Sequence, residues 1–206
     1  MSSFTNRVHH PNLVPYITAW SSERTQRPPV IVRGAGIGYA DESPYDRDGD
    51  GVLWMRESVS PGRGRPEFGR VHLMRQRRAM RRLLCQVCGR AADRDGDGVL
   101  WLLGEHDAAE LTTSHPPLCV PCAAQAARSC PYLRGGCTAV RARSRTPIGV
   151  HGMVYRPGFP FPVAETDGGV LYGDERIRWT RAAQLIVRLA EVTVVELHTG
   201  VPAARR

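Results

Sequence analysis

The sequence predicts an α+β fold, in which strands and helices form separate runs along the chain instead of alternating regularly. Three observations favour it. The 206 residues are 42% hydrophobic and 23% charged, which is typical of a globular protein. Strand-like segments flank a central part with two closely spaced cysteine pairs, and a few segments have the hydrophobic spacing of helices. We divide the chain into an N-terminal region (1–66), a central region (67–138) and a C-terminal region (139–206).

The N-terminal region is predicted to contain mainly β-structure. Tyr16–Trp20 is predicted to form a short apolar strand. Further along, Ile37–Glu42 and Val52–Glu57 are predicted to pair as a β-hairpin, because the Asp-Gly steps between them supply the positive-φ positions of a tight turn. The first residues do not combine a basic start with an apolar run, so we expect no secretory signal.

The loop of this hairpin belongs to a repeated acidic sequence. The nine residues DRDGDGVLW occur identically at 46–54 and at 93–101. The first copy fits the calcium-loop pattern D-x-D-x-D-G-x5-E with the carboxylates of Asp46, Asp48, Asp50 and Glu57. The second copy has Gly104 at the place of the last ligand. Because no pair of helices flanks the first copy, we favour the hairpin and keep Ca²⁺ binding as the alternative.

Residues 67–84 (EFGRVHLMRQRRAMRRLL) are predicted to form a helix that follows Pro66, since proline is tolerated in the first turn. At 100° per residue, most apolar side chains fall on one side of this helix. The other side carries six arginines: Arg70, Arg75, Arg77, Arg78, Arg81 and Arg82.

All 28 basic residues are arginines, and nine of them lie at 61–90 with only one acid. The rest of the chain has 19 basic and 19 acidic residues, so this window carries the whole net charge of +8. Because the guanidinium group matches phosphate geometry, nucleic acid is the partner that such a ridge predicts. The alternative is a solvated helix face whose arginines pair with the acidic loops of the same protein.

Six cysteines occur, at positions 85, 88, 119, 122, 130 and 137. The first four form two C-x2-C pairs with thirty residues between them. Two such pairs supply the four thiolates of a tetrahedral zinc site, so a structural Zn²⁺ is predicted at Cys85, Cys88, Cys119 and Cys122. Disulfides and a C-x-x-C redox pair are the weaker alternatives. The spacing assigns no role to Cys130 and Cys137.

The central region contains, in this order, a cysteine knuckle, a strand at Val99–Leu103 and a second cysteine pair that opens a helix after Cys122. This order resembles the treble-clef zinc fold over about residues 83–131. The run LLCQVCG…VLWLL…PPLCVPCAAQAARSCP is also similar to that of actinobacterial proteins without an assigned function. The resemblance implies a scaffold and no particular activity.

HNH nucleases use the treble-clef scaffold, and they place an Asp-His pair, an asparagine and a helix histidine around a divalent metal. In this chain Glu105-His106-Asp107 departs from the Asp-His order, and residues 99–131 contain no asparagine. A divergent nuclease with His106 as its base is therefore an alternative to a non-catalytic protein.

The C-terminal region is predicted to add strands and one helix. The helix is expected at Arg176–Glu191, and the strands at Val140–Arg145, Val150–Arg156, Gly169–Tyr172 and Val192–Leu197. Neither a phosphate-binding glycine loop that leads into a helix nor a Gly-x-Ser-x-Gly elbow occurs.

These observations predict a zinc-stabilised protein that binds DNA or RNA, in a regulatory role and without catalysis. The first alternative is a protein–protein interaction module with structural zinc, and the second is the divergent nuclease. No run approaches the roughly 20 apolar residues of a membrane helix, so we expect no membrane partner and a cytoplasmic location.

Overall fold

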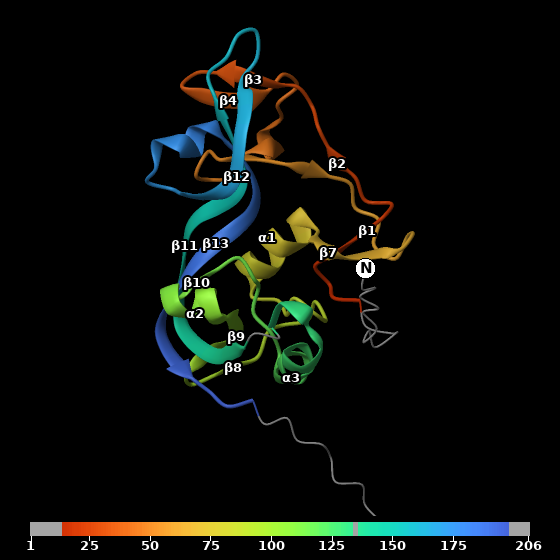
Figure 1. The fold of residues 1–206 in the computed structure, drawn as a ribbon, viewed down its shortest axis with the longest axis vertical. Coiled ribbons are helices and arrows are strands. Elements are labelled where there is room, and N and C mark those ends of the chain that lie inside the picture. The colour runs from red at the N-terminus through yellow and green to blue at the C-terminus, as the bar shows by residue number, and fades with distance from the viewer. Residues whose placement is uncertain (1–13, 134–135, 198–206) are drawn as a thin grey trace, which may run out of the picture.

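The structure, a computed structural model, describes residues 14–133 and 136–197 and is mixed α/β, mostly strands with three α-helices in that part of the chain. Its main sheet is built on two long strands, β11 (Cys137–Arg156) and β13 (Thr180–Val194), which pair antiparallel from Val140 to Val154. Figure 1 shows these strands running along the long axis of the molecule. The sheet also contains β5 (Leu53–Trp54), β8 (Arg94–Asp95), β9 (Gly98–Gly104), β10 (Thr112–Thr113) and β12 (Val163–Leu171). It thus takes strands from all three regions.

The helix that the sequence predicted at Arg176–Glu191 is wrong, because most of this segment belongs to the strand β13. A single 3-10 turn, η3 (Glu175–Trp179), precedes the strand. Buried Val187 and Leu189 alternate with exposed Arg188 and Ala190, which is the two-residue period of a strand. The same segment contains good helix formers, but pairing with β11 over most of its length outweighs that local preference.

The strand β11 is continuous, whereas the sequence predicted two strands separated by Thr146-Pro147. A shift in the pairing with β13 between Pro147 and Gly149 accommodates the proline, which cannot donate a backbone hydrogen bond. The predicted strand Gly169–Tyr172 is the end of the longer β12, and only Val192–Val194 of the last predicted strand is extended, as the end of β13.

The hairpin predicted between Ile37–Glu42 and Val52–Glu57 does not form, because each segment pairs elsewhere. The strand β4 (Gly36–Tyr39) pairs with β3 (Val30–Arg33), β5 runs parallel to β13, and β6 (Arg56–Glu57) pairs with β2 (Thr25–Gln26). The short 3-10 helix η1 (Pro44–Asp46) lies between β4 and β5 in the chain. The predicted strand Tyr16–Trp20 is confirmed in part as β1 (Thr18–Trp20).

The predicted helix at 67–84 is a strand followed by a shorter helix. The strand β7 (Pro66–Val71) pairs with β1, and α1 (Leu73–Arg82) begins only after His72. The His72 side chain caps the helix by accepting from the Arg75 amide, and left-handed Leu83 (φ 52°) ends it. Gln76 fixes α1 against the sheet, since its side chain donates to the Leu185 carbonyl (3.0 Å) and accepts from the Leu185 amide (3.1 Å).

The central region adds two more helices, α2 (Glu105–Glu110) and α3 (Val120–Ser129), and α3 confirms the helix expected around Cys122. One hydrophobic cluster packs α1 against the main sheet around Met80, Trp54 and Trp101. A second cluster surrounds Cys85, Leu118 and Cys122. Among the described residues, no helix has the length and apolar character that a membrane crossing requires.

Candidate metal centre and arginine groove

The structure brings the four cysteines of the two C-x2-C pairs together. The sulfur atoms of Cys85, Cys88, Cys119 and Cys122 all lie within 4.8 Å of one another. Within residues 14–133 and 136–197, they form the one group of three or more His, Cys, Asp or Glu side chains that is close enough to hold a metal ion. The Cys88 and Cys119 sulfurs are 3.8 Å apart, far beyond the ~2.05 Å of a disulfide bond.

Two backbone elements position these sulfurs. The first pair lies in a tight loop after α1, closed by hydrogen bonds from the Cys85 amide to the Arg90 carbonyl (2.7 Å) and from the Gly89 amide to the Cys85 carbonyl (2.8 Å). Gly89 has φ +72°, a conformation that glycine adopts without strain. In the second pair, Cys119 precedes the first residue of α3 and Cys122 lies in its first turn.

The four cysteine thiols differ in their burial and in the charged groups near them. Cys85 and Cys122 are buried, and burial raises the pKa of both thiols. Burial also acts on half-buried Cys88, but hydrogen bonds from the backbone and side chain of Arg90 outweigh it and lower the pKa of Cys88 to about 7. Because a metal binds thiolates, occupation of this centre releases protons.

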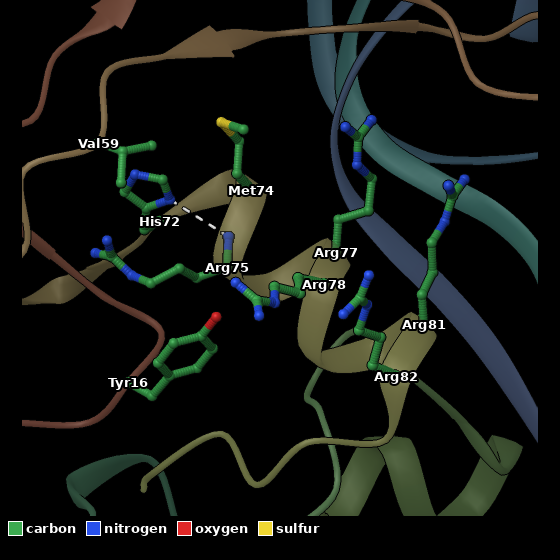
Figure 2. Close-up of a pocket in the computed structure, with 9 residues that line it drawn as sticks. All are labelled: Tyr16, Val59, His72, Met74, Arg75, Arg77, Arg78, Arg81 and Arg82. Carbon is green, nitrogen blue, oxygen red and sulfur yellow. Dashed lines mark hydrogen bonds between the residues drawn. The ribbon is translucent and has the colours of Figure 1, made fainter. Parts of the chain in front are cut away.

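A groove runs along the exposed face of α1, beside the loop with the first cysteine pair. Its volume is about 320 Å³. We call it the arginine groove, and Figure 2 shows the residues that line it: Tyr16, Val59, His72, Met74, Arg75, Arg77, Arg78, Arg81 and Arg82.

Two of the six arginines predicted to contact phosphate are bound within the protein. Arg75 is buried and pairs with Glu23 (2.7 Å), and it also donates to the Thr18 carbonyl (2.7 Å). Arg70 lies on β7 instead of the helix, where it pairs with Glu67 (2.7 Å) and donates to backbone carbonyls of the N-terminal region. Arg70 thus joins β7 to the end of β1, and Arg75 joins α1 to the start of β1.

The other four arginines line the groove, and they differ in how far their side chains are engaged by other residues of the protein. Arg77 stacks over the Trp54 ring at 4.3 Å, and burial followed by the charge of Arg81 lowers its pKa. Arg81 is half-exposed, and its guanidinium group lies 3.4 Å from the carboxylate of Asp48 in the first copy of the repeat. Arg78 and Arg82 are exposed, and no carboxylate or other hydrogen-bonding partner contacts them within the described part of the chain.

A buried polar cluster behind the groove was not predicted. Glu23, Glu57 and His72 are each at most 7% exposed, and they come from three separate segments. Burial opposes ionisation of Glu23, but hydrogen bonds from Arg75 and the Ser60 and Trp20 amides lower its pKa to about 2. Burial lowers the pKa of His72, whereas the charge of Glu57 raises it. No sequence pattern links these residues, because their contacts span up to 52 positions.

The candidate calcium ligands are not gathered into one site. Asp46 pairs with Arg56 (2.7 Å), and Glu57 accepts from the Leu73 amide (2.8 Å). Asp48 accepts from the amides of its own loop and from the Trp54 indole, and Asp50 is exposed.

Neither the residues considered for catalysis nor the two remaining cysteines belong to the groove lining or to the four-cysteine group. His106 is exposed on α2, next to Asp107, which contacts Thr113 and His115. Cys130 and Cys137 are half-buried and do not join the four-cysteine group.

Comparisons with protein-family models, with curated proteins and with solved structures found no match to this chain.

Proposed function

We propose that the protein binds nucleic acid through the arginine groove, and that a structural zinc ion in the four-cysteine centre stabilises the groove. The observation that carries the proposal is the pair Arg78 and Arg82, exposed and without an acidic partner among the described residues. They lie one helical turn apart, so they meet phosphates of one strand along the same helix face. DNA and RNA share this chemistry.

The sulfur geometry supports zinc as the ion. A tetrahedral site with Zn–S bonds of about 2.3 Å has sulfur–sulfur edges of about 3.8 Å, and the Cys88–Cys119 separation is 3.8 Å. Four protein ligands fill the coordination sphere, which favours a structural role over a catalytic one. The order of the cysteine loop, the β8–β9 hairpin and α3 supports a treble-clef scaffold.

The zinc proposal is tested by metal content and thermal unfolding. Cys88→Ser is expected to lose the ion and to unfold the central region, because the free energy of metal binding contributes directly to folding in such sites. Cys137→Ser is the matched control, since it removes a half-buried thiol outside the four-cysteine group. A Cys88→Ser protein with full zinc content and unchanged thermal stability contradicts the proposal.

The nucleic-acid proposal is tested by oligonucleotide binding in a salt series. If Arg78, Arg81 and Arg82 each contact one phosphate, the logarithm of the binding constant should fall with the logarithm of the salt concentration at a slope of about −3 on duplex DNA, at about 0.9 per contact. The double variant Arg78→Gln/Arg82→Gln is expected to reduce the slope by about 2. Arg143→Gln/Arg188→Gln removes the same charge from exposed positions on β11 and β13 and should leave the slope unchanged. Absence of binding at low salt, or equal slopes for the two double variants, contradicts the proposal.

A protein partner is the second candidate, and one observation favours it. The loop between β11 and β12 exposes Phe159 completely and Phe161 by 56%. Exposed aromatic side chains close together are typical of protein interfaces. Under this alternative the arginine groove does not bind oligonucleotides, and Phe159→Ser/Phe161→Ser abolishes partner binding without changing zinc content.

A further inference from the structure

The arginine groove has an apolar part as well as a cationic one. Tyr16, Val59 and Met74 line it together with the arginines, and the side chains of Val59 and Met74 are about half exposed (56% and 44%). Figure 2 shows the Tyr16 ring reaching into the same space as the Arg78 guanidinium. Phosphate neutralisation alone gives no reason for an aromatic ring and two apolar side chains at this place.

Tyr16 is held in place by the metal-binding loop. Its amide donates to the Val87 carbonyl (2.8 Å), and the Ile17 amide donates to the Gln86 carbonyl (3.2 Å). The ring packs over Gly89, since a Cβ atom at that glycine would lie only 2.9 Å from the ring. The cysteine loop therefore supports one side of the ring and fixes its position relative to α1.

The charges of the groove favour a phosphate next to this ring. No Asp or Glu side chain lines the groove within the described residues. The three acids that contact side chains of the groove lining are already engaged: Glu23 by Arg75, Glu57 by the Leu73 amide and His72, and Asp48 by its own loop and Arg81. The volume of about 320 Å³ lies at the small end of the roughly 300–1,000 Å³ typical of small-molecule sites. This space suits one nucleotide at a time.

We infer that the arginine groove binds single-stranded nucleic acid, with an unpaired base stacked on Tyr16 and the adjoining phosphates on Arg78 and Arg82. This inference rests on the proposed nucleic-acid function and adds the strandedness of the ligand. An aromatic ring can stack on a base only when the base is not enclosed in a duplex. The arginines contact phosphate in either form, so the base contact determines the selectivity.

The first experiment uses the wild-type chain with zinc and three fluorescent 12-mers whose labelled strands carry the same number of phosphates. They are a mixed-sequence single strand, its duplex and an abasic single strand. Single-strand affinity is expected to exceed duplex and abasic affinity about 5- to 100-fold, because each stacked base contributes about 1–3 kcal/mol. Equal affinity for all three overturns the inference and leaves the nucleic-acid function standing. Failure to bind any of them refutes the nucleic-acid function itself. Single-stranded RNA of the same sequence distinguishes the two sugars.

The second experiment separates the ring from the arginines. Tyr16→Leu keeps an apolar side chain but removes the aromatic face, and single-strand affinity should fall about 5- to 100-fold with an unchanged salt slope. Tyr16→Phe keeps the face and should bind as the wild type does. Zinc content and thermal unfolding are measured for both variants, because Tyr16 contacts the cysteine loop. If Tyr16→Leu disturbs that loop, the base contact is tested instead by comparing the affinities of the wild-type protein for the normal and the abasic single strand. Unchanged single-strand affinity in a zinc-loaded Tyr16→Leu protein overturns the inference.

Discussion

The two copies of DRDGDGVLW have the same nine residues and two different structures. In the first copy, residues 46–54 leave the 3-10 helix η1, turn around Asp48 and enter β5, which runs parallel to β13. In the second copy, residues 93–101 form the antiparallel β8–β9 hairpin, and β9 pairs with β11. The two tryptophans nevertheless enter the same hydrophobic cluster.

The partners of the two copies explain this difference. In the first copy, Asp46 binds Arg56, and Asp48 accepts from its own loop amides, from the Trp54 indole (2.8 Å) and from Arg81. In the second copy, the equivalent acids Asp93 and Asp95 both bind Arg141 of β11.

Only the first copy borders the arginine groove, because Arg77 stacks on its tryptophan and Arg81 contacts Asp48. The first copy thus lies beside the candidate functional surface, whereas the second copy, with the same sequence, has a structural role. Arginines from distant segments decide which of these roles each copy takes.

The largest difference is expected at the second glycine of each copy. Gly98 has φ +110°, and a Cβ atom there would lie 2.2 Å from the Ala142 carbonyl oxygen, so Gly98→Ala should lower the free energy of unfolding by more than about 3 kcal/mol. Gly51 has φ +76° but open space around it, and Gly51→Ala should cost only about 1 kcal/mol. Urea unfolding followed by tryptophan fluorescence measures both. Equal costs would mean that the two loops have the same structure.

The next effect depends on pH and concerns the first acid of each copy. The hydrogen bond from Arg56 outweighs burial and lowers the pKa of Asp46 from 3.8 to about 2. This group stabilises the fold above its unfolded-state pKa, so Asp46→Asn should cost about 2 kcal/mol at pH 7. The cost should shrink between about pH 4 and pH 2. Asp93→Asn should cost less, because that side chain is 35% exposed against 6% for Asp46. Unfolding free energies measured from pH 7 down to pH 2 test this, and a constant cost of Asp46→Asn contradicts it.

The two tryptophans should differ by about 1 kcal/mol. The Trp54 indole donates to Asp48 and stacks under Arg77, so Trp54→Phe loses a hydrogen bond and weakens a cation–π contact. The buried Trp101 indole N–H has no acceptor among the described residues, so Trp101→Phe removes an unpaired donor. Chemical unfolding of the two variants should show the larger loss for Trp54→Phe, and the reverse order would contradict the contacts described for the first copy.

The smallest effects on stability are expected for the arginines that contact each loop from the surface. Arg81→Gln and Arg143→Gln should each change the free energy of unfolding by less than about 1 kcal/mol, because the arginine side chains are about half exposed. Oligonucleotide affinity should distinguish them, since only Arg81 lines the groove. Equal losses of affinity would mean that general positive charge, and not the groove, attracts the ligand.

Local signals predicted part of the fold and of the candidate site. The helix around Cys122 and the strand at Val99–Leu103 agree with α3 and β9, because an alanine-rich run between prolines and an apolar run are sufficient to specify them. The predictions at 67–84 and Arg176–Glu191 were wrong wherever a distant strand offered pairing. Residues 66–71 pair with β1, and Thr180–Val194 pairs with β11, in spite of helix-forming residues.

The sequence by itself determined where the sulfur ligands and the positive charge are concentrated. Two-residue spacings keep each cysteine pair in one turn, and nine arginines in a thirty-residue window remain together in any fold. Only the tertiary structure decided which arginines stay available and what each copy of the repeat becomes. The physical reason is that a charged side chain is neutralised by whichever partner the backbone brings within about 4 Å. Glu23 reaches Arg75 across 52 positions, and nothing reaches Arg78 and Arg82 within the described residues.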